Sequence, residues 1–241
     1  GNHELSYNNV LDMSSAFYLG RELKQFLPTH TSIVIVKHNN PCGVASVPVV
    51  GGQLGLAKAQ LRAMELAWAG DPVSAFGGVI LFTDPVCEEA KAFFKQKFVD
   101  VMLAPKPLAD ADHFSSLFQA KKNLKGAWIQ HWDVGAVSES WKVTSIPGGK
   151  IHQTLDQGVD PELKPQTEVA WNEERKKLTQ FGSLVTRSLK SNSISLVYSP
   201  EKEVYQLIGA GQGQPNRIDA LAKLAVPRAL SVLKEAGLDP K

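Results

Sequence analysis

Lys37 and His38 directly follow a run of four apolar, β-branched residues, 33–36. A lysine ammonium can stabilise developing negative charge and an imidazole can accept a proton, so the pair suits a reaction that needs both. The apolar run predicts a strand buried on both faces in the middle of a sheet, and open α/β sheets place ligands at strand ends. Pro41 and Gly43 favour a turn there. An adjacent lysine and histidine are surface residues in most chains, so only their position makes them a candidate catalytic site.

Four further positions could bind a ligand, and each also has a structural explanation. Gly77 precedes a strand, where glycine admits a ligand or another backbone, and Asp100 could simply solvate a strand end. Asn192 could end a helix in the left-handed conformation. Arg217 follows a glycine-rich loop at the start of a predicted helix, where a cation opposes the helix dipole unless an anion binds. That loop, 209–217, matches neither a Walker pattern nor a GxGxxG fingerprint.

The elements that must position these residues alternate along the chain. Periodicity and composition predict helices at 10–26, 54–68, 85–98, 168–188 and 218–237, another around 114–120, a strand within 74–82, and strands at 32–36, 99–105, 194–199 and 204–209. Residues 47–52 look irregular. The alternation predicts an α/β fold with mostly parallel sheets. A boundary near 125–150 would divide the chain into residues 1–125, which contain the Lys-His turn, and 126–241.

Composition sets limits on the class of protein. The 241 residues are 43% hydrophobic and 21% charged with a net charge of +2, which is typical of a globular protein and does not favour nucleic acid or membrane as the main partner. Cys42 and Cys87 form neither a metal-ligand spacing nor a disulfide framework, and the histidines form no metal set. With no signal peptide or long apolar run in the sequence, we expect a cytoplasmic protein.

Five segments together resemble one known family. They are LSYNN from Leu5, KHNNPCG from Lys37, DPVSAFGG from Asp71, KSNS from Lys190 and GAGQ from Gly209, in the order and rough spacing of the transformylase part of the bifunctional purine-biosynthesis enzymes. The resemblance covers about residues 4–225. It implies aminoimidazolecarboxamide ribonucleotide (AICAR) transformylase activity, with 10-formyltetrahydrofolate as co-substrate and no metal. It also implies two cytidine-deaminase-like α/β units without zinc, in a homodimer with sites at the subunit interface.

The resemblance also implies a role for each candidate residue. His38 matches the proton acceptor and Lys37 the group that stabilises the transition state, while Ile218 matches a backbone contact to the folate. This suits the chemistry, because the delocalised amine of AICAR must lose its proton as it attacks the formyl carbon, and an oxyanion then forms. The positions matching nucleotide contacts are Gly77, Asp100, Asn192 and Arg217. The loop 211–216 is longer than in some relatives.

Parts of the family pattern are missing from this sequence. It begins after the Arg-Tyr-Gly-Glu-Asn-Pro-His-Gln segment, lacks the Phe-Phe-Pro-Phe stretch and the cyclohydrolase domain, and is expected to be either a fragment or a short relative. Two functions follow: an active formyltransferase, or a weakly active or inactive module of the same fold that binds a nucleotide or serves in assembly. A zinc deaminase is a distant third, because the sequence has no His-x-Glu with a Pro-Cys-x-x-Cys partner.

Overall fold

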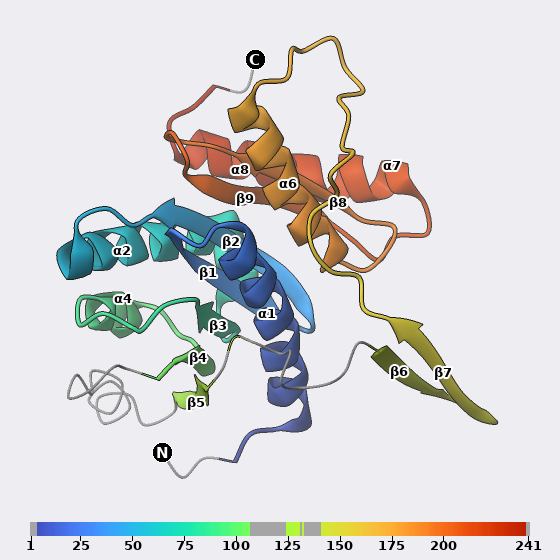
Figure 1. The fold of residues 1–241 in the computed structure, drawn as a ribbon, viewed down its shortest axis with the longest axis horizontal. Helices are drawn as coiled ribbons and strands as arrows, with labels where there is room; N and C mark the ends of the chain where they lie inside the picture. The colour runs from blue at the N-terminus through green and yellow to red at the C-terminus, as the bar shows by residue number, and fades with distance from the viewer. Residues whose placement is uncertain (1–3, 107–123, 131, 133–140, 240–241) are drawn as a thin grey trace.

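The computed structural model describes residues 4–106, 124–130, 132 and 141–239, so the helix predicted around 114–120 lies outside the described residues (Figure 1). The helices are α1 (Tyr7–Phe26), α2 (Gly52–Gly70), α3 (Pro72–Ala75), α4 (Ala90–Gln96), α6 (Glu173–Arg187), α7 (Arg217–Asp219), the π-helix η2 (Ala220–Ala225) and α8 (Val226–Glu235). The strands are β1 (His30–Lys37), β2 (Asn40–Pro48), β3 (Val79–Phe82), β4 (Val101–Pro105), β5 (Lys125–Ile129), β6 (Trp141–Ile146), β7 (Gly149–Thr154), β8 (Ile194–Tyr198) and β9 (Tyr205–Gly211).

A seven-stranded sheet organises the described part of the chain, in the order β5-β4-β3-β1-β2-β9-β8. The predicted buried strand is therefore its central strand, β1. Successive β1 side chains pack on opposite faces, because Ile33 and Ile35 belong to one buried cluster while Val34 and Val36 belong to another. Helices α2 and α4 cover the first face, and α1 and α6 cover the second (Figure 1). The predicted double burial of β1 is confirmed.

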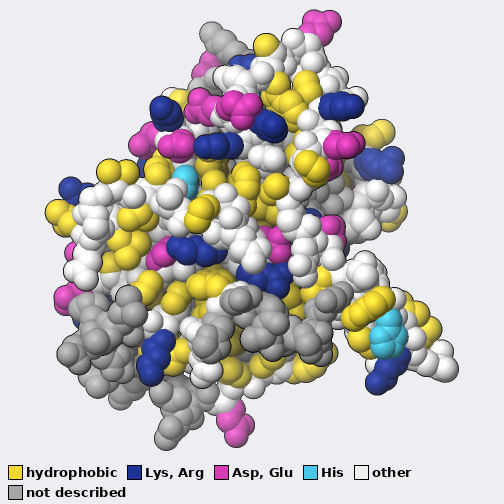
Figure 2. All heavy atoms as spheres, viewed as in Figure 1, with side chains coloured by type: hydrophobic (Ala, Val, Ile, Leu, Met, Phe, Trp, Pro, Cys, Tyr) yellow, Lys and Arg dark blue, Asp and Glu magenta, His cyan; other side chains and the backbone are white. Residues whose placement is uncertain are grey.

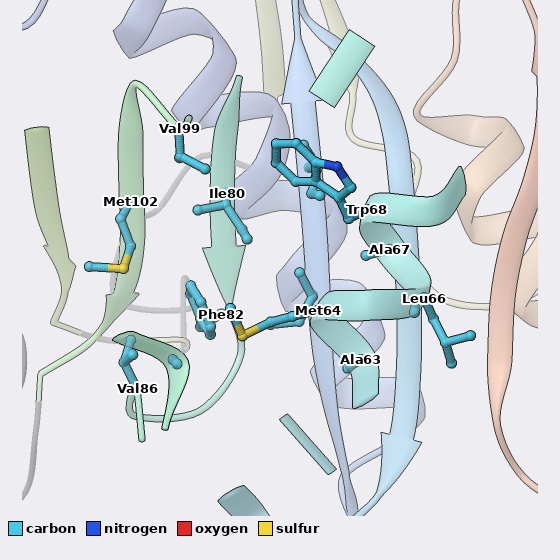
Figure 3. Packing of buried hydrophobic residues seen from close by; sticks show 14 of the residues in the cluster. Ala63, Met64, Leu66, Ala67, Trp68, Ile80, Phe82, Val86, Val99 and Met102 are labelled. Carbon is cyan, nitrogen blue, oxygen red and sulfur yellow. The ribbon is translucent and has the colours of Figure 1, made fainter. Parts of the chain in front are cut away.

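The packing of α2 shows how tightly the sheet is covered. Met64 and Trp68 of α2 point toward Ile80 and Phe82 of β3 (Figure 3), and all four side chains are at most 7% exposed. Alanines elsewhere on this helix keep it close to the strands beneath it. Where α2 crosses β2, a Cβ atom on Gly43 would lie only 2.0 Å from a carbonyl oxygen of the helix. That position therefore requires glycine, and the close contact fixes α2 against the start of β2.

The strand directions correct one expectation. Mostly parallel pairing was expected, and it is found between β3, β4 and β5, whereas β1 pairs antiparallel with both β2 and β3, and β9 pairs antiparallel with β2 and β8. The sheet is therefore mixed. The reason is local: the residues after Lys37 form a tight hairpin turn into β2, a strand that begins at Asn40 in a stretch predicted to be a turn and irregular chain.

Strands from both sides of residue 125 share this sheet. β9 joins β2 through the pairs Ala45–Gln206 and Ser46–Tyr205. The Tyr205 side chain is fully buried and packs in the same cluster as Val34 of β1. The segments 1–125 and 126–241 are thus joined by main-chain pairing as well as by core packing. Their identity as separate units stays a prediction.

A second, two-stranded sheet formed by β6 and β7 projects from the body (Figure 1). Every residue of both strands is exposed. Elsewhere on the face drawn in Figure 2, basic and acidic side chains are interspersed, in keeping with the small formal charge. Among the described residues, none of the helices combines the length and the apolar character needed to cross a bilayer.

The last predicted helix, 218–237, is interrupted. It is built from α7, the π-helix η2 and α8 in succession. η2 lies against β9 at glycine positions: a Cβ atom on Gly209 would be 2.2 Å from the carbonyl oxygen of Ala225, and one on Gly211 would meet that of Ala220. π-helical turns are rare and are often found at functional sites. Here Lys223 and Leu224 of η2 line the same cavity as Lys37 and His38.

Candidate functional site

Lys37 is the last residue of β1, and His38 is the first residue of the two-residue turn between β1 and β2. Lys37 pairs with Asn40 across the hairpin, and the two central residues, His38 and Asn39, both have positive φ angles, of 54° and 64°. This is the backbone signature of a type I′ turn, which matches the twist of paired strands. Each non-glycine residue in this conformation costs about 1–2 kcal/mol, although histidine and asparagine tolerate it better than most. The surrounding contacts must therefore stabilise this turn.

Helix α1 supplies those contacts. The Asp12 carboxylate accepts hydrogen bonds from the backbone N–H groups of His38, at 3.1 Å, and Asn39, at 2.6 Å. One helical turn further on, the Ser15 hydroxyl donates to the Asn39 side-chain oxygen at 3.1 Å. Asp12 is only 8% exposed, while His38 is exposed. Helix α1 thus anchors the backbone of the turn, and the His38 residue stays exposed to solvent.

The Lys37 ammonium is held on the other side of the turn. It donates a hydrogen bond to the backbone carbonyl of Phe76 at 2.5 Å, just after α3. The neighbouring Gly77 has a φ of 69° and donates its N–H to the carbonyl of Phe98 at 2.9 Å. A Cβ atom on Gly77 would lie 4.0 Å from the ammonium nitrogen. A side chain at Gly77 would therefore contact the Phe98 ring, at 3.4 Å, and approach Lys37, while a ligand contact at this position stays a prediction.

Asp100 lies at the start of β4, in a network with α1 and β5. Its carboxylate accepts a hydrogen bond from the Asn9 amide at 2.7 Å and lies 3.5 Å from the Lys125 ammonium, which also donates to Asn9 at 3.1 Å. The backbone N–H of Asp100 donates to the carbonyl of Gly78, next to Gly77. Asp100 is therefore more than a solvated strand end, because α1 connects it to the Lys37–His38 turn.

Asn192 and Arg217 belong to the opposite half of the sheet. Asn192 precedes β8 and holds the glycine-rich loop, because its side-chain amide donates to the carbonyls of Gln214 and Pro215, each at 3.0 Å. Arg217 is the first residue of α7 and is exposed, as is Ile218 at 75%. α7 is capped by the side chain of Asn216, not by the arginine. Asn192 therefore shapes the loop that presents Arg217 and Ile218.

The strand registers place all of these positions at one end of the sheet. β1 and β9 end there, while β2, β3, β4, β5 and β8 begin there. Lys37 and His38 lie at the carboxyl end of the buried strand β1, as predicted. The other positions lie at both carboxyl and amino ends, because β1, β2, β9 and β8 are antiparallel neighbours. The same residues are nevertheless gathered on one side of the molecule.

A cavity of about 580 Å³ adjoins the turn, and both Lys37 and His38 line it. Its other walls are the α2–α3 junction, the end of β9, and η2 with the start of α8. Asp71 and Arg228 form an ion pair of 3.2 Å in these walls. Gly77, Asp100, Asn192, Arg217 and Ile218 do not line this cavity. The cavity therefore occupies only part of this end of the sheet, next to Lys37 and His38. The remaining predicted positions lie at the same end of the sheet but outside the cavity lining.

Cys42 also lines this cavity but is a poor candidate nucleophile. Burial raises the pKa of its thiol to about 12, and the nearby charge of Asp71 acts in the same direction. The thiol donates weakly to the Ile35 carbonyl at 3.5 Å. Within the described residues, no group of three or more His, Cys, Asp or Glu side chains could hold a metal ion. The nucleophilic and basic chemistry available at the turn is thus that of Lys37 and His38.

Asn9, Asp12, Asp71 and Arg228 were not singled out from the sequence. Asn9 is the last residue of the LSYNN segment, and Asp12 lies on the same helix three residues later. Ser6 and Asn9 form the cap of this helix, but the Asn9 side chain also reaches Asp100. The available signal was polar residues at three-residue steps, which lie on one side of a helix.

Comparison with known proteins identifies the family of the chain. The family model described as AICARFT/IMPCHase bienzyme matches residues 1–228. Proteins named "Bifunctional purine biosynthesis protein PurH" are similar to the chain: that of Desulfitobacterium hafniense (strain DSM 10664 / DCB-2) is 35% identical over 94% of this chain and 39% of its own length. Those of Acidithiobacillus ferrooxidans (34%, covering 95% of this chain and 40% of the relative) and Magnetococcus marinus (35%, covering 98% and 40%) are comparable.

The chain thus spans about two fifths of the length of these relatives. The matched region contains the Lys37–His38 turn and the other positions gathered at the sheet edge. With a family model covering nearly all of the sequence, the chain belongs to the AICARFT/IMPCHase bienzyme family.

Proposed function

We propose that this chain carries formyl-transfer residues that act on AICAR, with 10-formyltetrahydrofolate as the formyl donor, in purine biosynthesis. Membership of the family supports this function over that of an inactive binding or assembly module. The observation that carries the proposal is the Lys37–His38 turn, because two parts of the fold hold the Lys37 ammonium and the His38 backbone, and both residues line one cavity.

In the proposed reaction, the amine nitrogen of AICAR attacks the formyl carbon while His38 accepts a proton from that nitrogen. Charge develops on the formyl oxygen, where the Lys37 ammonium stabilises it. Collapse of the intermediate breaks the bond to N10 of the folate, which takes up a proton, and leaves formylated AICAR and tetrahydrofolate. A single well-placed donor to such an oxyanion contributes about 3–4 kcal/mol.

The remaining residues would position the substrates. Gly77, Asp100, Asn192 and Arg217 are proposed to contact the nucleotide, and the backbone at Ile218 the folate. Their positions along one edge of the sheet support this assignment. The homodimer with interface sites, the two cytidine-deaminase-like units and the independence from metal stay proposals. In such a division the two units would share the seven-stranded sheet, because β9 pairs with β2.

The decisive experiment compares Lys37→Ala and His38→Ala with the unsubstituted protein in a quenched formyl-transfer assay and in calorimetric titration with AICAR. The intact protein that contains this chain is used. Each variant is expected to lose at least a hundredfold in kcat, about 2.7 kcal/mol, while AICAR affinity stays within tenfold. Lys58→Ala and His152→Ala, which change exposed side chains of the same types outside the cavity lining, are the matched controls.

If Lys37→Ala or His38→Ala retains near-normal transfer, the role assigned to that residue is wrong. AICAR binding without any transfer by the unsubstituted protein would favour the binding-module alternative.

A further inference from the structure

We propose that Asp12 is a positioning residue for the Lys37–His38 turn. Its carboxylate, held on the rigid helix α1, receives the two backbone N–H groups at the centre of the turn and thereby sets the direction in which the His38 side chain leaves the sheet. The inference rests on the proposed function, since it concerns the placement of the base used in formyl transfer. Asp12 acts through the backbone of the turn and is not itself a catalytic residue.

The geometry is that of a two-pronged contact. Oδ1 of Asp12 accepts from the Asn39 N–H at 2.6 Å, and Oδ2 accepts from the His38 N–H at 3.1 Å, so each oxygen serves one amide. The side chain is nearly buried, at 8% exposure. Hydrogen bonds to an ionised acceptor are stronger than neutral ones, and a low local dielectric strengthens them further. A carboxylate with this contact resists rotation of either peptide unit.

The turn needs such a partner for a definite reason. The ladder across the hairpin ends at the pair Lys37–Asn40, so the N–H groups of His38 and Asn39 have no partner on the opposite strand. Both residues also have positive φ angles, which non-glycine residues adopt only when the surroundings favour them. Consecutive N–H groups in such a turn converge and form a natural site for an anion. Asp12 supplies that anion from within the chain.

The same helix links the turn to the rest of the edge. Ser15 donates to the side chain of Asn39, and Asn9 donates to Asp100. Asn9, Asp12 and Ser15 are spaced by three residues, which places them along one side of α1. The helix therefore sets the spacing between the proposed base at His38 and the proposed nucleotide contact at Asp100. Displacing the turn from α1 would alter that spacing without touching either side chain.

The first part of the test measures the contact itself. Amide hydrogen exchange of His38 and Asn39 is followed by NMR in the intact protein and in Asp12→Ala, Asp12→Asn and Asp12→Glu. In Asp12→Ala both amides should exchange at least tenfold faster, equivalent to about 1.4 kcal/mol of lost protection. Asp12→Asn keeps one acceptor oxygen and should expose one amide more than the other. Unchanged protection of both amides in Asp12→Ala would overturn the inference.

The second part measures the consequence for transfer. Below the unfolding transition, with the folded fraction checked by circular dichroism, kcat of Asp12→Ala should fall at least tenfold while the KM for AICAR changes less than threefold. Asp12→Glu, which restores a carboxylate one methylene away, should recover part of the loss. Normal kcat in a folded Asp12→Ala would also overturn the inference.

The matched control is Glu22→Gln, which alters another buried carboxylate of α1 that contacts Arg21 and Arg187 and not the turn. It should lower stability without slowing transfer or exposing the amides of His38 and Asn39. An equal loss of kcat in Glu22→Gln would overturn the specific role of Asp12. If the unsubstituted protein shows no formyl transfer, the proposed function fails, and the amide exchange alone then supports or overturns the role of Asp12. Should Asp12→Ala not fold, Asp12→Asn decides: unchanged protection of both amides in that variant would overturn the inference.

Discussion

Lys37 and His38 are neighbours in the chain, yet different parts of the fold hold them. The Lys37 ammonium is bound by a carbonyl that follows α3, whereas the backbone of His38 is bound by α1. Both anchors come from segments distant in sequence. A substitution that loosens one anchor should therefore affect one catalytic group and leave the other in place. This separation is what allows the two roles, oxyanion stabilisation and proton acceptance, to be tested independently.

A substitution at Gly77 tests its proposed contact with the nucleotide. Gly77→Ala should weaken AICAR binding at least threefold, because the added methyl group would occupy space proposed for the nucleotide, 3.4 Å from the Phe98 ring and 4.0 Å from the Lys37 ammonium. Its φ of 69° also adds a backbone cost of about 1–2 kcal/mol. Calorimetry measures the affinity, and urea unfolding measures the stability.

Gly237→Ala is the control for that substitution, since Gly237 has a φ of 74° and open space where the methyl group would go. Both variants should lose similar stability. The role of Gly77 at the site would be refuted if the two variants bound AICAR equally well.

Among the elements, α1 serves the site and the core together. Ala16, Leu19 and Leu23 pack against the sheet, while Asp12 and Ser15 reach the turn. The helix begins at a capping box in which Ser6 and Asn9 exchange hydrogen bonds. Its position relative to the site therefore depends on ordinary core packing. Contacts near its other end, far from the turn, tie it to α6.

The contact between α1 and α6 can be tested by a substitution of Glu22. It is 6% exposed and binds Arg21 at 2.8 Å and Arg187 of α6 at 2.9 Å. Burial by itself raises the pKa of the Glu22 carboxyl, but the hydrogen bonds from Arg21 and Gly158 and the charge of Arg187 outweigh it, so the pKa is lowered. Glu22→Gln should cost about 2–4 kcal/mol of unfolding free energy at pH 7, because the arginines would lose their counter-charge.

The pH dependence of this loss has a definite sign. A carboxyl whose pKa is lower in the folded state stabilises the fold above its unfolded pKa, near 4.5, and the stabilisation is lost as the pH falls through the folded value. The difference between the unsubstituted protein and Glu22→Gln should therefore be largest at neutral pH and shrink below about pH 4.5. Urea unfolding at several pH values measures it. A difference independent of pH would show that the charge of Glu22 is not what stabilises the α1–α6 contact.

For the molecule as a whole, the pairing of β2 with β9 makes one sheet from two halves of the chain. The buried cluster on the α1 side also crosses this boundary, since it contains Val36 of β1 and Leu207 of β9. The candidate site also depends on both halves of the chain, because the residues proposed to bind the nucleotide come from both. Cooperative unfolding of the described core is the expected result.

This expectation can be tested through Gly209. A methyl group there would lie 2.2 Å from the carbonyl oxygen of Ala225, so Gly209→Ala should push η2 away from β9 and lower stability by about 1–3 kcal/mol. Hydrogen exchange detected by mass spectrometry should show peptides from β1 and β9 losing protection together. Gly149→Ala, at an open position in the β6–β7 hairpin, is the control. If β9 lost protection while β1 kept it, the two halves would be independent units.

Much of the fold was predictable because its signals are local. The apolar run 33–36 indicated a strand buried on both faces, and the helical periodicities of 10–26 and 54–68 correspond closely to α1 and α2. Helix ends were less predictable: the helix expected at 85–98 is only Ala90–Gln96. The π-helical interruption of the last helix has no local signal, since it depends on the close approach of η2 to glycines in β9.

The same distinction between local and long-range contacts applies to the candidate site. By itself the sequence determined the chemical groups and their immediate setting, Lys37 and His38 after a buried strand, because residue type and strand burial are readable from neighbouring residues. Only the tertiary structure decided that the chain reverses at His38 into β2, that Asp12 of α1 meets this turn, and that β9 brings the loop before Arg217 to the same edge. These features depend on contacts between residues far apart in the chain, whose energies no local pattern contains.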